Sequence, residues 1–203
     1  MFSLNNTNHV NQFFNMSTST VQHIILTGSP GVGKTTIIQK VCSELLRKDV
    51  PVKGFYTSEV REKGKRIGFD VVSLAGEKSS LARIGNITGP KVGQYVVDLQ
   101  SFESVALPIF KSLNENSIIV IDEIGKMELF SKSFEIATKT AFSSRNTILG
   151  TIPVQKGKPI PLVEFVRSHP SVKLITVDMK NRDHIADEIV QLLTSSFHDL
   201  GKK

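Results

Sequence analysis

The residues Gly28-Ser29-Pro30-Gly31-Val32-Gly33-Lys34-Thr35 form a complete G-x-x-x-x-G-K-[ST] pattern, and this stretch decides the fold of the chain. The apolar residues 21–27 before it indicate a buried strand, and residues 36–41 after it open a helix. A strand, a glycine-rich loop and a helix in this order are the context that the pattern needs. Glycines allow backbone N–H groups to approach phosphate oxygens, and the start of a helix adds partial positive charge. The sequence therefore predicts a loop that binds the phosphates of a nucleotide.

Two side chains carry the chemistry of this predicted loop. Lys34 is expected to reach the β- and γ-phosphates, and we assign it a catalytic role because it offsets the charge that develops there. Thr35 is expected to ligate Mg²⁺ through its hydroxyl. The residues expected to surround the phosphates are Gly28, Ser29, Pro30, Gly31, Val32, Gly33, Lys34, Thr35 and Thr36.

A second motif supports the first. Residues 117–121 form an apolar run that ends in Asp122 and Glu123, which is typical of a central parallel strand buried on both faces. Acids at the carboxyl end of such a strand lie where ligands bind in an open α/β sheet. We therefore expect Asp122 to hold Mg²⁺ and Glu123 to orient or deprotonate a water molecule. The alternative for Glu123 is an acid on a solvated loop.

Composition limits the class of protein and of partner. The chain of 203 residues, with 39% hydrophobic and 22% charged residues, is most naturally one globular domain. A net charge of +6 fits an anionic substrate such as a nucleotide, and it fits nucleic acid as well. Nucleic acid is the weaker inference because no dense Lys/Arg tract with interleaved aromatic residues occurs. The sequence identifies no protein partner.

The location of the protein is predicted from what its sequence contains and lacks. A single cysteine, Cys42, cannot form an internal disulfide, which favours an intracellular and cytoplasmic location. No apolar stretch approaches the length of a membrane span, so we expect no membrane association. Residues 1–20 are rich in Asn, Ser and Thr and contain no Lys or Arg, so they match neither a secretory signal nor a mitochondrial one. We interpret them as a disordered tail.

The order of patterned segments predicts the architecture. After residue 21 the strand and helix patterns alternate, which favours a parallel sheet with helices on both faces. Between about residues 61 and 98, several β-rich segments follow one another without a helical pattern. We therefore expect residues 21–203 to form an α/β domain with a phosphate-loop NTPase core and a β-rich insertion at about 61–98.

The ordered set of motifs resembles the P-loop nucleoside-triphosphatase family whose animal members are called cancer-related nucleoside-triphosphatases. Besides residues 28–36, the similar segments are 54–57, 66–72, 92–98, 120–130, 149–154 and 181–184. The resemblance implies Mg²⁺-dependent hydrolysis of nucleoside triphosphates to diphosphate and phosphate, with ATP, GTP, CTP and UTP all accepted. It implies the same site residues as the motifs do, namely the loop 28–36, Asp122 and Glu123.

Catalysis at a γ-phosphate is expected to need one more cation. The candidates are Arg66, Lys126 and Arg182. For each of them, an ordinary solvated or ion-paired surface position is an equal alternative.

Two other functions stay open at the level of sequence. A GTPase-type switch is suggested by Asp122-Glu123-Ile124-Gly125, which matches D-x-x-G, but the Asn-Lys-x-Asp motif that reads guanine is absent. A nucleotide or small-molecule kinase is the second alternative. The basic segment 154–159 could act as its lid, although the sequence offers no clear acceptor pocket.

Overall fold

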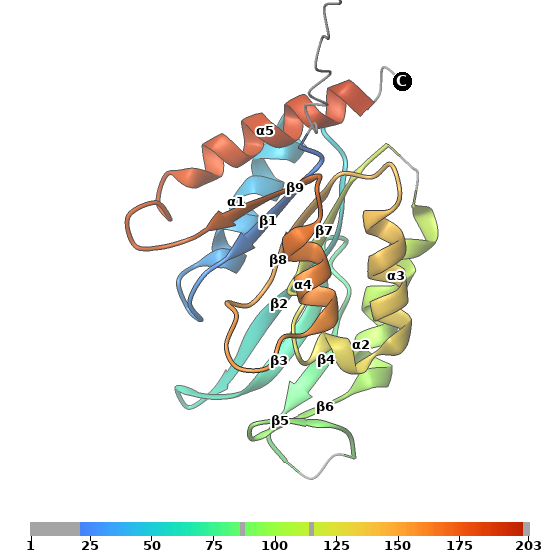
Figure 1. Cartoon of the computed structure of the whole chain (residues 1–203). Coiled ribbons are helices and arrows are strands. Elements are labelled where there is room, and N and C mark those ends of the chain that lie inside the picture. Colours follow the sequence, from blue (N-terminus) through green and yellow to red (C-terminus); the bar gives the residue numbers. More distant parts are fainter. Residues whose placement is uncertain (1–20, 86–87, 114–115, 201–203) are drawn as a thin grey trace, which may run out of the picture.

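The structure is a computed structural model that describes residues 21–85, 88–113 and 116–200 (Figure 1). Within them, nine strands form one sheet in the order β5-β6-β4-β3-β2-β7-β8-β1-β9. The tail predicted for residues 1–20 lies outside the described residues. None of the helices in these described ranges is long and apolar enough to cross a membrane.

One half of the sheet is parallel and forms the core of the fold. Its five strands are β9 (Val172–Thr176), β1 (His23–Thr27), β8 (Ile148–Thr151), β7 (Ile118–Asp122) and β2 (Val52–Glu62). The described parts of β1, β7 and β8 are buried along their whole length, as expected for parallel strands with helices on both faces. Their carboxyl ends meet at one edge of the sheet, where α/β proteins bind ligands.

The other half of the sheet is antiparallel. It contains β3 (Lys65–Ser73), β4 (Lys78–Arg83), β5 (Lys91–Val92) and β6 (Tyr95–Val97), and β2 joins it to the parallel half. These strands fall in the region where the sequence indicated a β-rich insertion. The sequence did not predict β4, because its residues Lys-Ser-Ser-Leu-Ala-Arg show no clear alternation of polar and apolar side chains.

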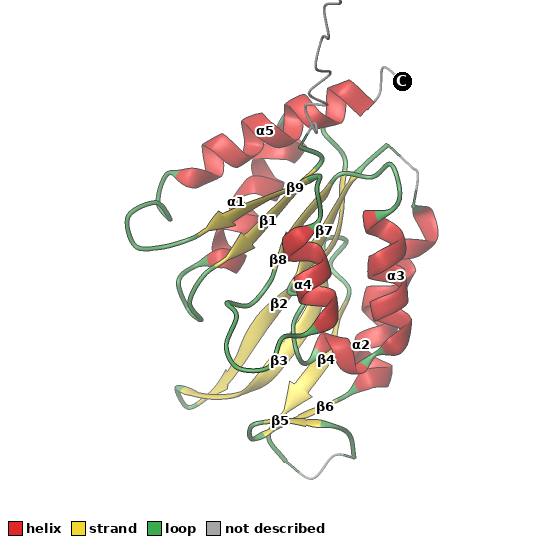
Figure 2. Cartoon of the chain, viewed as in Figure 1, coloured by secondary structure: helices red, strands yellow, loops and turns green. Residues whose placement is uncertain are grey.

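Helices cover both faces of the sheet (Figure 2). The helices α1 (Lys34–Arg47) and α5 (Ile185–Leu200) pack on one face, and α2 (Leu99–Ala106), α3 (Lys132–Phe142) and α4 (Pro161–Ser168) pack on the other. Each central strand contributes side chains to two hydrophobic cores, one on each face of the sheet. In β7, for example, Ile118 and Val120 join the core under α1, whereas Ile119 and Ile121 join the opposite core. The predicted fold class, an α/β fold with a parallel core and helices on both faces, is confirmed.

Two predicted helices are interrupted. The pattern over residues 101–113 predicts one helix, but α2 ends at Ala106 and a 3₁₀ turn with a proline at its start covers Leu107–Ser112. The pattern over residues 126–143 also predicts one helix. Here α3 begins only after Ser131, whose Oγ accepts a hydrogen bond from the backbone N–H of Phe134 at 3.0 Å. A serine N-cap of this kind starts a helix, and it leaves the preceding residues free to turn into the ligand edge.

Candidate active site

The loop 28–33 connects β1 to α1 at the carboxyl edge of the sheet. Gly33 is the N-cap of α1 with a φ of 111°, which a residue with a side chain rarely adopts. A Cβ on Gly28 would lie 2.5 Å from the carbonyl oxygen of Val177, so only glycine allows the loop to pass so close to the residue that follows β9. The start of α1 therefore faces the ligand edge with its free N–H groups.

Lys34 links this loop to the predicted catalytic acid. Its Nζ donates a hydrogen bond to the carbonyl oxygen of Gly28 at 3.0 Å, and it lies 3.8 Å from Oε2 of Glu123. The Lys34 side chain is only 10% exposed, which strengthens its electrostatic interactions. The two residues that the sequence assigned to catalysis are thus neighbours, although 89 positions separate them in the chain.

Asp122 ends β7 and is almost completely buried, at 2% exposure. Its Oδ1 accepts a hydrogen bond from the hydroxyl of Thr151 at 2.6 Å, at the end of the adjacent strand β8. Its Oδ2 is buried and has no hydrogen-bond partner among the described residues. Burial raises the pKa of Asp122, while the hydrogen bond from Thr151 and then the nearby Thr35 hydroxyl act to lower it.

These two side chains fit a hard divalent cation. A buried carboxylate oxygen without a partner, next to a threonine hydroxyl, is the hard oxygen donor set that Mg²⁺ prefers. Within the part of the chain that the structure describes, no cluster of three or more His, Cys, Asp or Glu side chains forms a closed metal cage. Such a site fits an ion that is shared between one or two protein oxygens and substrate phosphates.

Glu123 extends from the end of β7 into the same site, and its side chain is 31% exposed. Burial raises the pKa of Glu123, and the nearby Lys34 ammonium opposes this shift. A raised carboxylate pKa makes a better proton acceptor near neutral pH. The structure thus places Glu123 within reach of solvent and beside a cation, which suits a residue that orients a water molecule.

A further acid, Glu128, was not identified from the sequence. It is 5% exposed, and it lies beside Gly125 together with Glu123, because a Cβ on Gly125 would be 3.1 Å from Oε2 of Glu128 and 2.7 Å from Oε1 of Glu123. Burial, and then the charge of Glu123, raises the pKa of Glu128 to about 8. The raised pKa favours the protonated form of Glu128, and the negative charge of Glu123 contributes to this shift.

Glu128→Gln is expected to remove a pH dependence of folding stability. The pKa of about 8 in the folded protein exceeds the ordinary 4.5, so only the unfolded chain ionises Glu128 between these values. Wild-type stability should fall by about 1.4 kcal/mol per pH unit as the pH rises through this window, and the uncharged glutamine should not show this loss. Urea unfolding at pH 5, 6, 7 and 8 measures the difference. Parallel stability curves for the two proteins would contradict the assignment. Glu62→Gln, at an exposed acid of β2, is the matched control.

A cavity of about 750 Å³ joins these groups. It is lined by all of the predicted phosphate-binding residues except Ser29, which is exposed, and Val32, which packs against the core under α1. Asp122, Glu123 and Glu128 line it as well. The cavity continues past Glu123 to strands β3 and β5 and to the basic loop after β8, whose Lys156 and Lys158 face it.

The three candidate cations differ in position. Arg66 and Lys126 line the cavity. Arg182 does not line it, and its Nε lies 3.6 Å from a carboxylate oxygen of Asp183. The position of Arg182 is that of an ion-paired surface residue, which is one of the two alternatives that the sequence left open.

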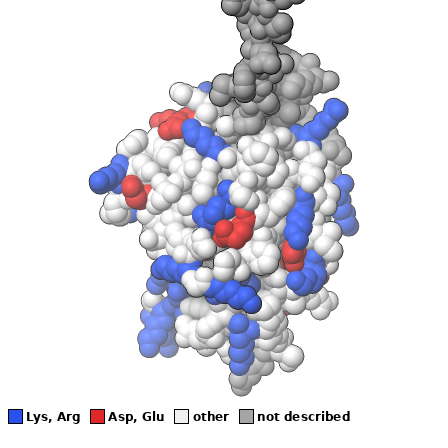
Figure 3. Space-filling view, viewed as in Figure 1, with Lys and Arg blue, Asp and Glu red and all other residues white. Residues whose placement is uncertain are grey.

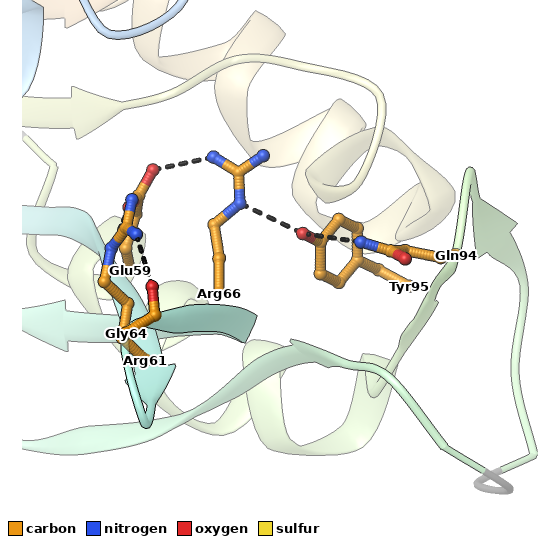
Figure 4. A network of polar contacts seen from close by, with 6 residues as sticks. All are labelled: Glu59, Arg61, Gly64, Arg66, Gln94 and Tyr95. Carbon is orange, nitrogen blue, oxygen red and sulfur yellow. Dashed lines mark hydrogen bonds and ion pairs between the residues drawn. The ribbon is translucent and has the colours of Figure 1, made fainter.

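Arg66 is held in place by a network of polar contacts (Figure 4). Its Nε donates to the hydroxyl of Tyr95 at 3.0 Å, and its Nη1 donates to Oε1 of Glu59 at 2.7 Å. Its guanidinium lies 5.1 Å from the ring centroid of Phe69, a cation–π distance. The network ties Arg66 of β3 to β2 and β6, so its charge has a fixed place at the wall of the cavity.

Thr151 could have been found in the sequence, because it ends a predicted strand and polar side chains at such ends face the ligand edge. The roles of Glu59 and Tyr95 could not have been predicted from the sequence. Their contacts with Arg66 join three strands of the antiparallel region, and no short motif records which residues face one another across that sheet.

Comparisons with known proteins identify the family of the chain. A family model described as NTPase matches residues 23–190. The human cancer-related nucleoside-triphosphatase is 50% identical over 186 residues, which cover 86% of this chain and 98% of that protein. The solution structure of a human cancer-related nucleoside triphosphatase matches with a TM-score of 0.77 and 50% identity, over 86% of this chain and 98% of the other. The crystal structure of THEP1 from Aquifex aeolicus matches with a TM-score of 0.75 and 37% identity, over 84% and 98%. The resemblance expected from the motifs is confirmed, and the chain belongs to the NTPase family.

Proposed function

We propose that the protein hydrolyses nucleoside triphosphates to nucleoside diphosphate and phosphate, that it requires Mg²⁺, and that it tolerates different bases. The observation that carries this proposal is the position of Lys34. Its ammonium lies between the phosphate loop and Glu123, in the cavity that also contains the buried Asp122. A phosphate cradle, a metal-binding carboxylate and a water-orienting acid thus share one space, as phosphoryl transfer to water requires.

Different groups of the chain have different roles in the proposed reaction. The N–H groups of the loop and the start of α1 bind phosphate oxygens, and Lys34 offsets charge on the β- and γ-phosphates. Glu123 orients the attacking water and accepts its proton. Thr35 and Asp122 would hold Mg²⁺, which supplies positive charge to the phosphate oxygens when it is bound. A net charge of +6 favours the approach of an anionic substrate.

Tolerance of the base is supported by the loop that follows β9. Asn181 could resemble a guanine-reading residue, but its amide is used locally. Its Nδ2 donates to the carbonyl oxygen of Thr176 at 2.8 Å, and its Oδ1 accepts from the backbone N–H of Asp178 at 3.0 Å. These bonds hold the Asn181 amide within its own loop, and the sequence lacks the Asn-Lys-x-Asp order, which argues against a guanine-specific switch. The buried thiol of Cys42 suits the intracellular setting that we propose.

We expect ATP, GTP, CTP and UTP to be hydrolysed with kcat/KM values within about a hundredfold of one another, or roughly 3 kcal/mol. The binding groups of the site address phosphates and Mg²⁺, which all four share. A buried site that reads one base rejects others by about 10⁴–10⁵. Competition kinetics with the four triphosphates measures the ratio. A preference above about 10⁴ for one base would overturn the tolerant-hydrolase proposal and favour the switch.

Asp122→Asn is expected to raise the Mg²⁺ concentration that half-maximal activity requires. The substitution keeps the size of the side chain but removes a carboxylate charge from a site for a hard cation. A Mg²⁺ titration of phosphate release at saturating ATP measures the shift. Asp187→Asn on α5, where the acid is exposed, is the control. If the titration of Asp122→Asn coincides with that of the wild type, the metal is held elsewhere.

A further inference from the structure

A shallow depression of about 360 Å³ lies on the surface next to the catalytic cavity. It is lined by Lys91, Val92, Gly93, Lys126, Leu129, Phe130 and Ile160. Val92, Lys126 and Ile160 also line the catalytic cavity, whereas the other four residues do not. None of the described residues 28–36 lines the depression. The depression is therefore a separate feature that borders the catalytic cavity, and the proposed hydrolysis does not use it.

Phe130 is an exposed aromatic residue with cations beside it. It is 39% exposed, whereas the preceding Leu129 packs against the hydrophobic core. Lys91 of β5 and Lys126, which follows β7, are exposed and line the same depression. A large aromatic surface in water is unfavourable, and a flat group that stacks on it removes that surface from water. Phe130 therefore offers a stacking platform in a positively charged setting.

The turn between β2 and β3 carries further positive charge. Arg61, Lys63 and Lys65 are exposed there. Arg61 orders the turn, because its Nη1 donates a hydrogen bond to the carbonyl oxygen of Gly64 at 3.1 Å. None of these three described cations lines the catalytic cavity or the depression, so they belong to the outer surface of the protein.

The β2–β3 hairpin and the depression are linked across the antiparallel region. Nε of Arg66 on β3 donates to the hydroxyl of Tyr95 on β6 at 3.0 Å (Figure 4), and Tyr95 is paired with Val92 of the depression. The strands β4 and β6 lie between β3 and β5, which corresponds to about 14 Å at the usual strand spacing. Lys and Arg side chains gather on the lower part of the face in Figure 3, where Figure 1 shows the β2–β3 hairpin and β5. We call the following residues together the basic surface: Arg61, Lys63, Lys65, Lys91, Lys126 and Phe130.

The positive charge of the basic surface is largely without a protein partner. Its four lysines form no ion pair within the ranges that the structure describes. The acids closest to the β2–β3 turn in the sequence are Glu59 and Glu62. Glu59 is already paired with Arg61 and Arg66, each at 2.7 Å, and Glu62 is exposed. Much of the net charge of +6 therefore lies on this surface, which favours a ligand with several negative charges.

We propose that the basic surface binds a single-stranded polynucleotide, whose phosphates contact the lysines and one of whose bases stacks on Phe130. Cations along the backbone and an aromatic ring for a base are the two parts from which single-strand binding sites are built. An acidic peptide would use the cations but has no row of flat bases, and a duplex keeps its bases stacked inside. RNA and DNA should bind alike, because the contacted groups are phosphates and a base. The proposal does not rest on the proposed hydrolysis.

The sequence made nucleic acid the weaker partner because it contains no continuous basic tract. The basic surface is instead assembled from three segments, at residues 61–65, at residue 91 and at residues 126–130. The pairing of β2 with β3 and of β5 with β6 contributes to this assembly. A folded face can therefore be basic where the order of residues in the chain is not.

The direct test is the fluorescence anisotropy of a labelled oligo(U) of about 12 nucleotides, titrated with the full-length protein at about 50 mM salt without ATP. We expect saturable binding with a Kd of about 10⁻⁵ M or below, since contacts made mainly with phosphates tighten at low salt. Oligo(dU) of the same length should bind within about threefold. A duplex of the same length should bind at least about fivefold more weakly, because its bases cannot stack on Phe130. No binding at about 10⁻⁴ M protein, or a duplex bound as tightly as the single strand, would overturn the proposal.

The salt dependence of binding measures the contribution of the lysines. Each phosphate neutralised on a single strand contributes about −0.7 to the slope of log K against log salt, so four lysines predict a slope of about −2.8. Lys63→Gln/Lys65→Gln should make the slope less steep by about 1.4. Lys48→Gln/Lys111→Gln removes the same charge from exposed positions outside the basic surface and should keep the wild-type slope. Equal slopes for the wild type and Lys63→Gln/Lys65→Gln would contradict the proposal.

Phe130→Ala should lower the affinity for oligo(U) roughly fivefold or more without changing the salt slope, because it removes a stacking platform and no charge. Phe165→Ala on α4 is the matched control. Phe165 is 36% exposed and lines neither the catalytic cavity nor the depression, so this variant should bind as the wild type does. If Phe130→Ala binds oligo(U) as tightly as the wild type, the surface binds charge alone and the proposal is wrong.

Two competitors separate a polynucleotide from other occupants. Poly-glutamate of matched charge should displace oligo(U) at least about tenfold less effectively, since it cannot stack on Phe130. Equal displacement would indicate an acidic protein as the occupant and overturn the proposal. ATP with Mg²⁺, at the concentration that half-saturates hydrolysis, should leave most of the oligo(U) bound. Complete displacement at that concentration would show that the basic surface belongs to the triphosphate site, and the proposal would be wrong.

Discussion

Lys34→Ala is expected to reduce steady-state hydrolysis of ATP to the background level and to weaken ATP binding about tenfold or more. The substitution removes the only side-chain charge that the phosphate loop directs to the β- and γ-phosphates, and a hydrogen bond to a charged group contributes about 1.5–3 kcal/mol. It also leaves Glu123 without the cation that lies 3.8 Å away, which disfavours the ionised form that accepts a proton. Phosphate release and equilibrium binding of ATP measure the two effects.

The matched control for Lys34→Ala is Lys40→Ala on the same helix. Lys40 is half exposed and lies 3.9 Å from Asp187 of α5, outside the cavity. It should keep wild-type turnover, since exposed ion pairs contribute little to stability. Near-wild-type turnover in Lys34→Ala itself would show that the loop does not hold the reacting phosphates.

Glu123→Gln should separate binding from chemistry. The amide is almost the same size as the carboxylate and leaves Asp122 to hold the cation, so we expect the affinity for ATP to be retained. Turnover should fall by roughly 10²–10⁴, the usual range for the loss of a general base. Single-turnover rates and equilibrium binding, measured on the same preparation, test both parts. Glu62→Gln, with the same substitution at an exposed acid, controls for the loss of charge.

If the affinity of Glu123→Gln falls in parallel with its turnover, the role of Glu123 is different. A parallel loss would indicate that Glu123 holds the metal or the structure of the site rather than the water. The position of Glu128 beside Glu123 would then have to be explained by that structural or metal-binding role.

The parallel core could be predicted because its signals are local. The phosphate loop is recognised from eight consecutive residues, 28–35. The strand that ends in Asp122 is recognised from its continuous run of apolar residues. Two such motifs place the carboxyl ends of two strands at the same edge of a sheet, and the alternation of strand and helix patterns predicts the rest of the α/β fold. The activity was predicted from the resemblance of these motifs to a family, and the family is confirmed by the match over residues 23–190.

The rest of the site depends on contacts that no local pattern records. Thr151 and Asp122 lie on neighbouring strands but are 29 positions apart in the chain. Glu128 was expected within a longer helix, and the N-cap at Ser131 instead turns it into the cavity. The strand β4 and the network around Arg66 belong to antiparallel pairing, which is set by packing between strands rather than by residue type.

Phosphate release from ATP with Mg²⁺ and no added acceptor tests the central claim most directly. In this assay water is the only acceptor, and the released phosphate and ADP are followed together from the first turnover. We predict that the wild type forms one phosphate for each ADP at a constant rate and that Lys34→Ala forms neither above the background level. A wild-type rate equal to that of Lys34→Ala, or ADP that forms only when a second substrate is added, would contradict the assignment of this cavity as the site of nucleoside triphosphate hydrolysis.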